Sequence, residues 1–186
     1  MKLLIIYHSG LADDAKSIFK EYVRQGIDVT VIVPLKNGSL VYGRQHAEKE
    51  FKYIPLKFKA GFNILTLFFI IKRVNPDIIH VIDEYTSLSL FEAVVIRNVL
   101  HFFGSKKIPV FSLSFQNLPL LSPPFVFSSP AAFLRRVTHK VLFPFIIRYH
   151  KKNLAGVVGG NQEALEILKN LEVKAPMRFI FWGVDL

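Results

Sequence analysis

Apolar and polar residues follow one another along the chain in blocks that predict a repeated order of strand and helix. The run from Lys2 to His8 is short and mostly apolar, which is typical of a strand buried on both faces. The next segment has the spacing of an amphipathic helix that ends near Gly26. Its apolar stripe consists of Ala15, Ile18, Phe19, Tyr22 and Val23. With a second apolar run from Asp28 to Pro34, the pattern predicts a right-handed parallel βαβ unit.

The alternation continues along the rest of the chain and indicates the fold class. We expect further strands at 52–58, 77–83, 109–115, 155–160 and 178–183, and helices at 62–74, 87–103, 131–152 and 161–171, the last of them capped by Asn161. Pro144 is expected to kink or divide the helix at 131–152. The order predicts an α/β protein with a Rossmann-like, doubly wound and mostly parallel sheet that has helices on both faces. The length favours a single domain, residues 1–186.

Candidate ligand-binding residues come directly after the predicted strands, because ligands of open α/β sheets bind beyond the carboxyl ends of the strands. The residues at these positions are His8, Ser9, Gly10, Asp83, Glu84, Tyr85, Gln116, Asn117, Gly159, Gly160 and Asn161. Gly10 lies between a strand and a helix N-terminus, where free backbone N–H groups favour an anion. The repeated glycines of a dinucleotide fingerprint and the lysine of a P-loop are absent there. A simple tight turn explains Gly10 equally well.

The stretch DEYTS, residues 83–87, has two interpretations of equal weight. In the first, Thr86 or Ser87 caps the following helix, and the two acids interact favourably with its N-terminus. In the second, a carboxylate in a crevice accepts hydrogen bonds from a sugar hydroxyl or acts as a base.

Other chemistries have weak support in the sequence. The six histidines show no metal-binding spacing such as HExxH, so no metal site is expected. His80 lies inside a predicted strand and is expected to be a hydrogen-bonded core residue. The chain has no cysteine and no GxSxG motif, which excludes a thiol nucleophile and argues against a serine hydrolase.

Charge is distributed unevenly. The formal net charge is +10, and the stretch 93–162 contains nine Lys or Arg residues but no Asp or Glu. Such a stretch attracts anionic partners, namely phosphate groups, acidic lipids or nucleic acid. The alternative is a solvated basic face that has no specific partner. The longest apolar run, Ile64 to Ile71, is too short to span a membrane.

The segment 122–153 combines aromatic and aliphatic residues with a set of cations. These cations are Arg135, Arg136, Lys140, Arg148, Lys151 and Lys152. A basic amphipathic helix of this kind is typical of a surface in the lipid headgroup layer. The alternative is a core helix with its basic residues directed outward. We expect a cytoplasmic protein, and the first interpretation adds peripheral contact with the inner face of the membrane.

Three stretches carry a resemblance to a known family: NPDIIHVIDEYTSLSLFEAVVIRN, FSLSFQN, and the C-terminal NLAGVVGGNQEALEILKN followed by RFIFWGVDL. In this order they resemble the N-terminal domain of a GT-B glycosyltransferase, close to the retaining family 4. The resemblance implies a second Rossmann-like domain that binds most of the nucleotide-sugar and carries two glutamates in an E-x7-E region. No such region occurs here. We therefore expect an N-terminal half whose C-terminal donor-binding domain is absent from the sequence.

The resemblance also implies an activity and roles for particular residues. The family transfers a sugar with retention, without a metal or cofactor, from a nucleotide-sugar to an acceptor held mainly by the N-terminal domain, here a glycan or a lipid-linked acceptor. By position, Gly10 would approach the donor phosphates, and Glu84 with Tyr85 would lie on the acceptor side. Gln116 and Asn117 match a QN pair of one subgroup, where many relatives have His. It stays open whether Gln116 assists catalysis or shapes the acceptor pocket.

A second hypothesis is a stand-alone α/β module that binds an anionic ligand or nucleic acid through its basic face. The sequence contains no recognisable recognition helix and no RNP-type motif, so nucleic acid is not expected as a partner. Under the glycosyltransferase hypothesis, the 186-residue chain alone is expected to be nearly inactive, because one half of the cleft does not enclose and orient a donor.

Overall fold

The computed structural model describes residues 1–7, 13–34, 50–56, 62–83, 85–114 and 130–180, with the backbone alone for 13–14 and 130–141. Seven strands form one sheet in the order β3-β2-β1-β4-β5-β6-β7, and every neighbouring pair is parallel. The strands are β1 (Lys2–Tyr7), β2 (Asp28–Pro34), β3 (Lys52–Leu56), β4 (Ile78–Ile82), β5 (Val110–Ser114), β6 (Gly156–Gly159) and β7 (Met177–Phe179). The helices are α1 (Asp13–Arg24), α2 (Ile64–Val74), α3 (Leu88–Phe102), α4 (Pro130–Asn153) and α5 (Gln162–Asn170).

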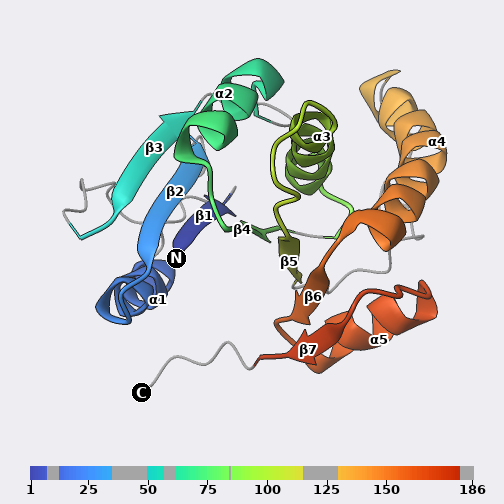
Figure 1. The fold of residues 1–186 in the computed structure, drawn as a ribbon. Helices are drawn as coiled ribbons and strands as arrows, with labels where there is room; N and C mark the ends of the chain where they lie inside the picture. Colours follow the sequence, from blue (N-terminus) through green and yellow to red (C-terminus); the bar gives the residue numbers. More distant parts are fainter. Residues whose placement is uncertain (8–12, 35–49, 57–61, 84, 115–129, 181–186) are drawn as a thin grey trace.

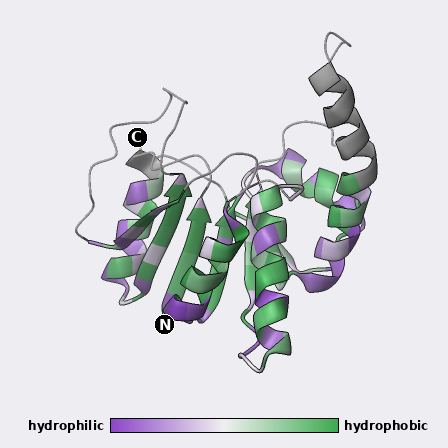
Figure 2. Cartoon of the chain, turned by 90° about the horizontal axis from the view of Figure 1, so that it is seen from above, coloured by the Kyte–Doolittle hydropathy of each residue, from purple (hydrophilic) through white to green (hydrophobic). Residues whose placement is uncertain are grey.

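The predicted fold class is confirmed. Helices cover both faces of the sheet: α1 lies on one face, and α2, α3 and α4 lie on the other (Figure 1). Every predicted strand and helix is present, and each begins within two residues of its expected start in the part of the chain that the structure describes. Residues 181–183 of the last predicted strand lie outside that part. Figure 2 shows that the central strands are hydrophobic and that the helices carry mixed hydropathy.

Strand β1 explains why the sheet has a core on each side. Its side chains alternate between two clusters, with Leu4 and Ile6 facing α2 and α3, and Leu3 and Ile5 facing α1. Each of these four is at most 6% exposed. A strand between two parallel neighbours has no solvent face, which is why its sequence lacks polar alternation.

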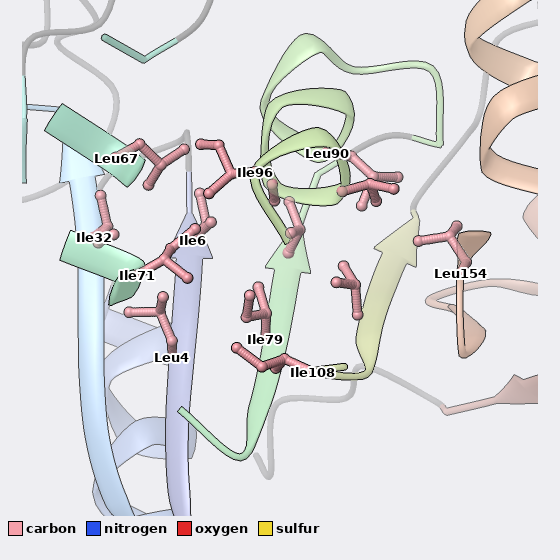
Figure 3. Close-up of a cluster of buried hydrophobic side chains, with 14 of the residues drawn as sticks. Leu4, Ile6, Ile32, Leu67, Ile71, Ile79, Leu90, Ile96, Ile108 and Leu154 are labelled. Atoms are coloured by element: carbon pink, nitrogen blue, oxygen red, sulfur yellow. The ribbon is translucent and has the colours of Figure 1, made fainter. Parts of the chain in front are cut away.

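Helix α2 illustrates how the pattern of apolar residues becomes packing. Leu67 and Ile71 lie one turn apart on the same side of the helix, and Figure 3 shows them directed toward Leu4, Ile6 and Ile32. Both are fully buried.

The expected division of α4 at Pro144 is wrong. Pro144 lies inside α4, and the helix is continuous from Pro130 to Asn153. Two aromatic residues after the proline hold this part of the helix on α3: the rings of Phe145 and Tyr149 lie 6.1 and 5.4 Å from that of Phe91. These contacts offset the backbone hydrogen bond that proline removes.

Two leucines on α2 give a test of this packing. Leu67 is 0% exposed and Leu65 is 68% exposed. We expect Leu67→Ala to lower the free energy of unfolding by about 2–5 kcal/mol, because it leaves a cavity in the core. The matched substitution Leu65→Ala should change it by less than about 0.5 kcal/mol. Urea unfolding of both variants measures the difference, and equal losses would contradict the burial described here.

Candidate functional site

The carboxyl edge of the sheet brings together the strand ends from which the predicted site residues continue. The register pairs Tyr7 of β1 with Ile82 of β4, and Ser114 of β5 with Gly159 of β6. The strand order also reverses at β1 and β4, and such a switch point is where ligands of this fold class bind. The expected convergence of these strand ends on one edge is therefore confirmed for the described residues.

Six of the candidate residues lie outside the described part of the chain: His8, Ser9, Gly10, Glu84, Gln116 and Asn117. Their places along the sequence are next to strand ends that the structure does describe. Gly10 comes three residues after β1, and Gln116 comes two residues after β5. Their predicted roles stay predictions.

Asp83 is the residue that joins β4 to this edge. Its side chain is buried, and its carbonyl oxygen accepts a hydrogen bond of 3.3 Å from the Ser112 hydroxyl on β5. Ser112 and Ser114 are themselves fully buried. A side chain–backbone bond between neighbouring strands fixes the chain just before Glu84, so the exit from β4 is rigid.

Tyr85 packs inside the protein, although the sequence placed it on the acceptor side. The side chain is 0% exposed and belongs to the core cluster under α3. Its hydroxyl is buried without a hydrogen-bond partner, and burial raises the pKa of Tyr85 above the ordinary tyrosine range. In this conformation the ring supports the edge from beneath and does not line its surface.

His150 on α4 holds the backbone at Tyr85. Its Nδ1 lies 2.7 Å from the Tyr85 carbonyl oxygen, so this nitrogen carries the proton and donates. The two rings meet edge to face, with centroids 5.4 Å apart. His150 is fully buried, its Nε2 has no partner, and burial lowers its pKa to about 4 despite the opposing effect of the bond to Tyr85. The imidazole is therefore neutral at pH 7, and it links α4 to the loop that carries Glu84.

Two helices begin at the carboxyl edge with capped N-termini. The Ser87 hydroxyl accepts a bond of 3.2 Å from the Leu90 N–H at the start of α3, so the capping interpretation of DEYTS is confirmed for Ser87. The Asn161 side chain accepts a bond of 2.6 Å from the Ala164 N–H at the start of α5. Helix N-termini carry partial positive charge and favour anionic groups. Asn161 was predicted as this cap from sequence.

Gly159 shows how closely β6 and α5 approach each other. A Cβ atom at this position would lie 2.6 Å from the Cγ of Leu165, and real contacts of that kind are longer. Gly160 follows it and donates its N–H to the Ser114 carbonyl oxygen at 2.9 Å. The glycine pair at the end of this strand is thus explained by close packing and a ladder bond.

Sequence reasoning missed Glu92. Its carboxylate accepts a bond of 2.9 Å from the Phe62 N–H, which joins α3 to the chain that leads into α2. Burial raises the pKa of Glu92 to about 7, against the lowering effect of that bond. The available signal was a single acid within the apolar sequence of α3.

Arg97 was also missed as a structural cation. It lies in the acid-free stretch but is buried, and its guanidinium donates to the carbonyl oxygens of Ile108 and Asn153. Next to it, the Asn98 amide donates to the Tyr149 hydroxyl at 2.6 Å. A cation on the last carbonyls of a helix is stabilising, so Arg97 fixes the C-terminal end of α4 against α3.

The cations predicted for a membrane or anion surface are only partly described. Arg148 and Lys152 are exposed on α4, and the Lys151 Nζ lies 3.9 Å from the Glu172 carboxylate. Arg135, Arg136 and Lys140 lie on α4, and their side chains are outside the described part. Among the described residues, no helix has the length and apolar character needed to cross a bilayer.

Two further predictions concern histidine. His80 lies within β4 as expected, but its buried Nε2 has no hydrogen-bond partner, and burial lowers its pKa to about 4. The expectation of a hydrogen-bonded core residue is therefore wrong for this nitrogen. In the part of the chain that the structure describes, no group of three or more His, Asp or Glu side chains is placed to hold a metal ion.

Comparison with known proteins supports the fold. No protein-family model and no curated protein matches the sequence. The structure is similar to a solved chain of sucrose-phosphate synthase from Thermosynechococcus elongatus, with a TM-score of 0.61 and 11% identity over 100% of this chain and 91% of that one. It is also similar to UDP-N-acetylglucosamine 2-epimerase from Rickettsia bellii, with a TM-score of 0.56 and 13% identity over 96% of this chain and 44% of the epimerase. At these identities the likeness shows a shared Rossmann-like fold.

The buried imidazole of His150 predicts loss of stability in acid. Its pKa is about 4 in the folded chain, against 6.5 for an exposed histidine. The unfolded chain therefore takes up the proton first as the pH falls. The contribution of His150 to the free energy of unfolding is therefore fully present above pH 6.5 and is lost as the pH falls toward 4. Between pH 7 and pH 5 the loss from this group is roughly 2 kcal/mol. We expect His150→Gln to reduce the difference in unfolding free energy between these two pH values by about that amount.

Urea unfolding at both pH values measures the effect, and the comparison of differences is independent of how stable the variant is at pH 7. If the unfolding free energy of the variant changed between pH 7 and pH 5 as much as that of the unaltered chain, His150 would not be the titrating group.

Proposed function

We propose that this chain is the acceptor-binding half of a retaining GT-B glycosyltransferase, which transfers a sugar from a nucleotide-sugar to a glycan or lipid-linked acceptor. The observation that carries the proposal is the parallel sheet whose carboxyl edge joins the segments resembling family 4, with the capped starts of α3 and α5 at that edge. The likeness of the whole chain to a chain of sucrose-phosphate synthase supports it. A donor-binding domain would complete the enzyme.

The proposed division of work follows the positions along the edge. Glu84 would accept a hydrogen bond from an acceptor hydroxyl and orient it, since a carboxylate is a strong acceptor. Gln116 and Asn117 would contact the acceptor from the neighbouring strand end. Gly10 would allow the backbone to approach the donor phosphates closely, because glycine has no side chain.

The described residues contribute rigidity to this arrangement. The Ser112 hydroxyl holds the Asp83 carbonyl, and His150 holds the Tyr85 carbonyl, so both residues beside Glu84 are fixed to different elements. Positioning of an acceptor within a fraction of an ångström accounts for a large share of a rate enhancement. The buried Tyr85 would act here as a support for Glu84.

The cations on α4 would contact an anionic membrane surface in this proposal, which suits an enzyme that acts on lipid-linked or cell-envelope glycans at the cytoplasmic face. Exposure of Arg148 and Lys152 is consistent with that contact.

Kinetics of the two-domain enzyme test the role of Glu84. We expect Glu84→Gln to raise the acceptor KM by roughly tenfold, the value for loss of one charged hydrogen bond, and to leave the donor KM unchanged. Glu166→Gln, an exposed carboxylate on α5, is the matched control and should change neither. A rise in donor KM alone would assign Glu84 to the other substrate.

A second prediction concerns the 186-residue chain alone. It should turn over almost no nucleotide-sugar, because one wall of the cleft neither encloses nor orients the donor, and its natural reading frame should encode a second α/β half. Product formation assayed with labelled donors, with and without that half, measures this. Robust turnover by the chain alone would refute the division into two halves.

A further inference from the structure

Helices α2, α3 and α4 form one layer on one face of the sheet (Figure 1), and each turns apolar or cationic residues outward. On α2 the outward positions include Leu65, Phe69 and Lys72, spaced by four and three residues. On α4 they include Phe145 and Arg148. Side chains at such spacing share one side of a helix. We call the outer side of these three helices, together with residues 103–107 that follow α3, the outer helical surface.

The most exposed aromatic side chains of this surface lie at the end of α3. Phe102 is 84% exposed and Phe103 is 75% exposed, and their rings are 5.4 Å apart. Phe69 on the neighbouring α2 is 64% exposed. Large aromatic groups so far out of the core lose the benefit of burial, and a group of them on one side of a protein marks an interaction surface.

Cations surround these aromatic residues. Those with described, exposed side chains are Lys72, Arg73, Lys106, Lys107, Arg148 and Lys152. The sequences of the three helices contain one acid, Glu92, and it is partly buried and bonded to the Phe62 N–H. Asp77, in the loop after α2, is held by Lys106 at 2.6 Å and by the Lys2 N–H at 2.8 Å. The outer helical surface therefore has a positive field that its acids do little to offset.

Charge on α1, which covers the opposite face, is different. That helix has three acids, Asp13, Asp14 and Glu21, and three bases, Lys16, Lys20 and Arg24. Among α1 to α4, the excess of positive charge thus lies on α2, α3 and α4, on the face that also exposes aromatic residues. Apolar groups combined with one sign of charge are the two signals that bind a protein to an anionic bilayer.

We propose that the outer helical surface rests on an anionic membrane, with Phe69, Phe102 and Phe103 inserted at the headgroup boundary and the surrounding cations bound to lipid phosphates. Charge complementarity selects this occupant. A second copy of the chain would present the same positive surface to the first and be repelled. The exposed aromatic side chains gain little from a nucleic-acid duplex, whose phosphates the cations alone would bind.

This contact also sets the orientation of the site, a step that rests on the proposed function. Phe102, Phe103 and Lys106 lie between the end of α3 and the start of β5, and Lys106 bonds to Asp77 just before β4. They therefore lie at the amino edge of the parallel sheet, opposite the carboxyl edge and its candidate site. The membrane contact would leave that site facing away from the bilayer.

Vesicle flotation tests the contact directly. The chain should bind vesicles that contain phosphatidylglycerol and should not bind vesicles of phosphatidylcholine alone. Phe102→Ser combined with Phe103→Ser should bind the anionic vesicles at least about tenfold more weakly, because the inserted apolar area is lost. Phe179→Ser with Ile180→Ser, which removes two exposed apolar residues on and just after β7, is the matched control and should bind as the unaltered chain does.

A second pair of variants tests the charge. Arg148→Gln on α4 should weaken binding about fivefold, the value for one cation near an anionic surface. Arg24→Gln, an exposed arginine on the opposite face, should have no effect. Thermal unfolding should be nearly unchanged in all four variants, since the substituted side chains are exposed.

Several outcomes would overturn the proposal. They are equal binding to both kinds of vesicle, no binding to either, and equal binding by the Phe102/Phe103 variant and its control. A change of oligomeric state on substituting Phe102 and Phe103 would assign the surface to a second copy instead. Transfer to a soluble acceptor without vesicle binding would remove the membrane contact and leave the glycosyltransferase proposal intact. Vesicle binding by a protein that binds no nucleotide-sugar would support the membrane contact and refute the glycosyltransferase proposal.

Discussion

Strand β1 pairs in parallel with both β2 and β4, and this pairing constrains everything around it. A strand with two parallel neighbours is covered on both faces, so its side chains must serve two cores at once, as Leu4 and Ile5 do. Parallel neighbours also require crossover connections, and because the chain crosses the sheet in both directions from β1, their helices lie on both faces. Since all strands point the same way, their carboxyl ends meet at one edge. The same pairing that buries β1 therefore gathers the candidate site residues.

Polar groups inside the helical layer fix the elements that apolar packing alone would leave free to shift. Arg97 joins α3 to the end of α4, and His150 joins α4 to the backbone at Tyr85. Buried polar bonds of this kind specify one arrangement, because any other leaves charges or donors unpaired. Three atoms of these groups nonetheless have no partner among the described residues: the Tyr85 hydroxyl, the His150 Nε2 and the Arg97 Nε. Buried polar atoms without partners are destabilising, so this part of the core is polar at some cost in stability.

The periodicity of the sequence was enough to predict the fold class, the strands and helices, and the cap at Asn161, since each depends on residues near in sequence. It did not predict the continuous helix through Pro144, because that depends on the rings of Phe91, Phe145 and Tyr149 meeting between two helices. Nor did it separate buried from exposed cations: Arg97 and Arg148 look alike in the acid-free stretch, and the partners of Arg97 are 11 and 56 residues away. Nor did it predict that Tyr85, expected on the acceptor side, packs against His150 of α4, 65 residues away.

The handedness of the crossovers explains how an uneven sequence becomes an uneven surface. From β3 onward, the connections through α2, α3, α4 and α5 carry the chain in one direction across the sheet, whereas α1 carries it the opposite way from β1 to β2. Right-handed crossovers in one direction place their helices on one face. Exposed cations far apart in sequence, such as Lys72, Lys107 and Arg148, thus lie on the face where Phe102 and Phe103 are exposed. The charge of α1 is balanced within the helix and falls on the other face, so the crossovers place the excess of positive charge of α2, α3 and α4 on one side of the sheet.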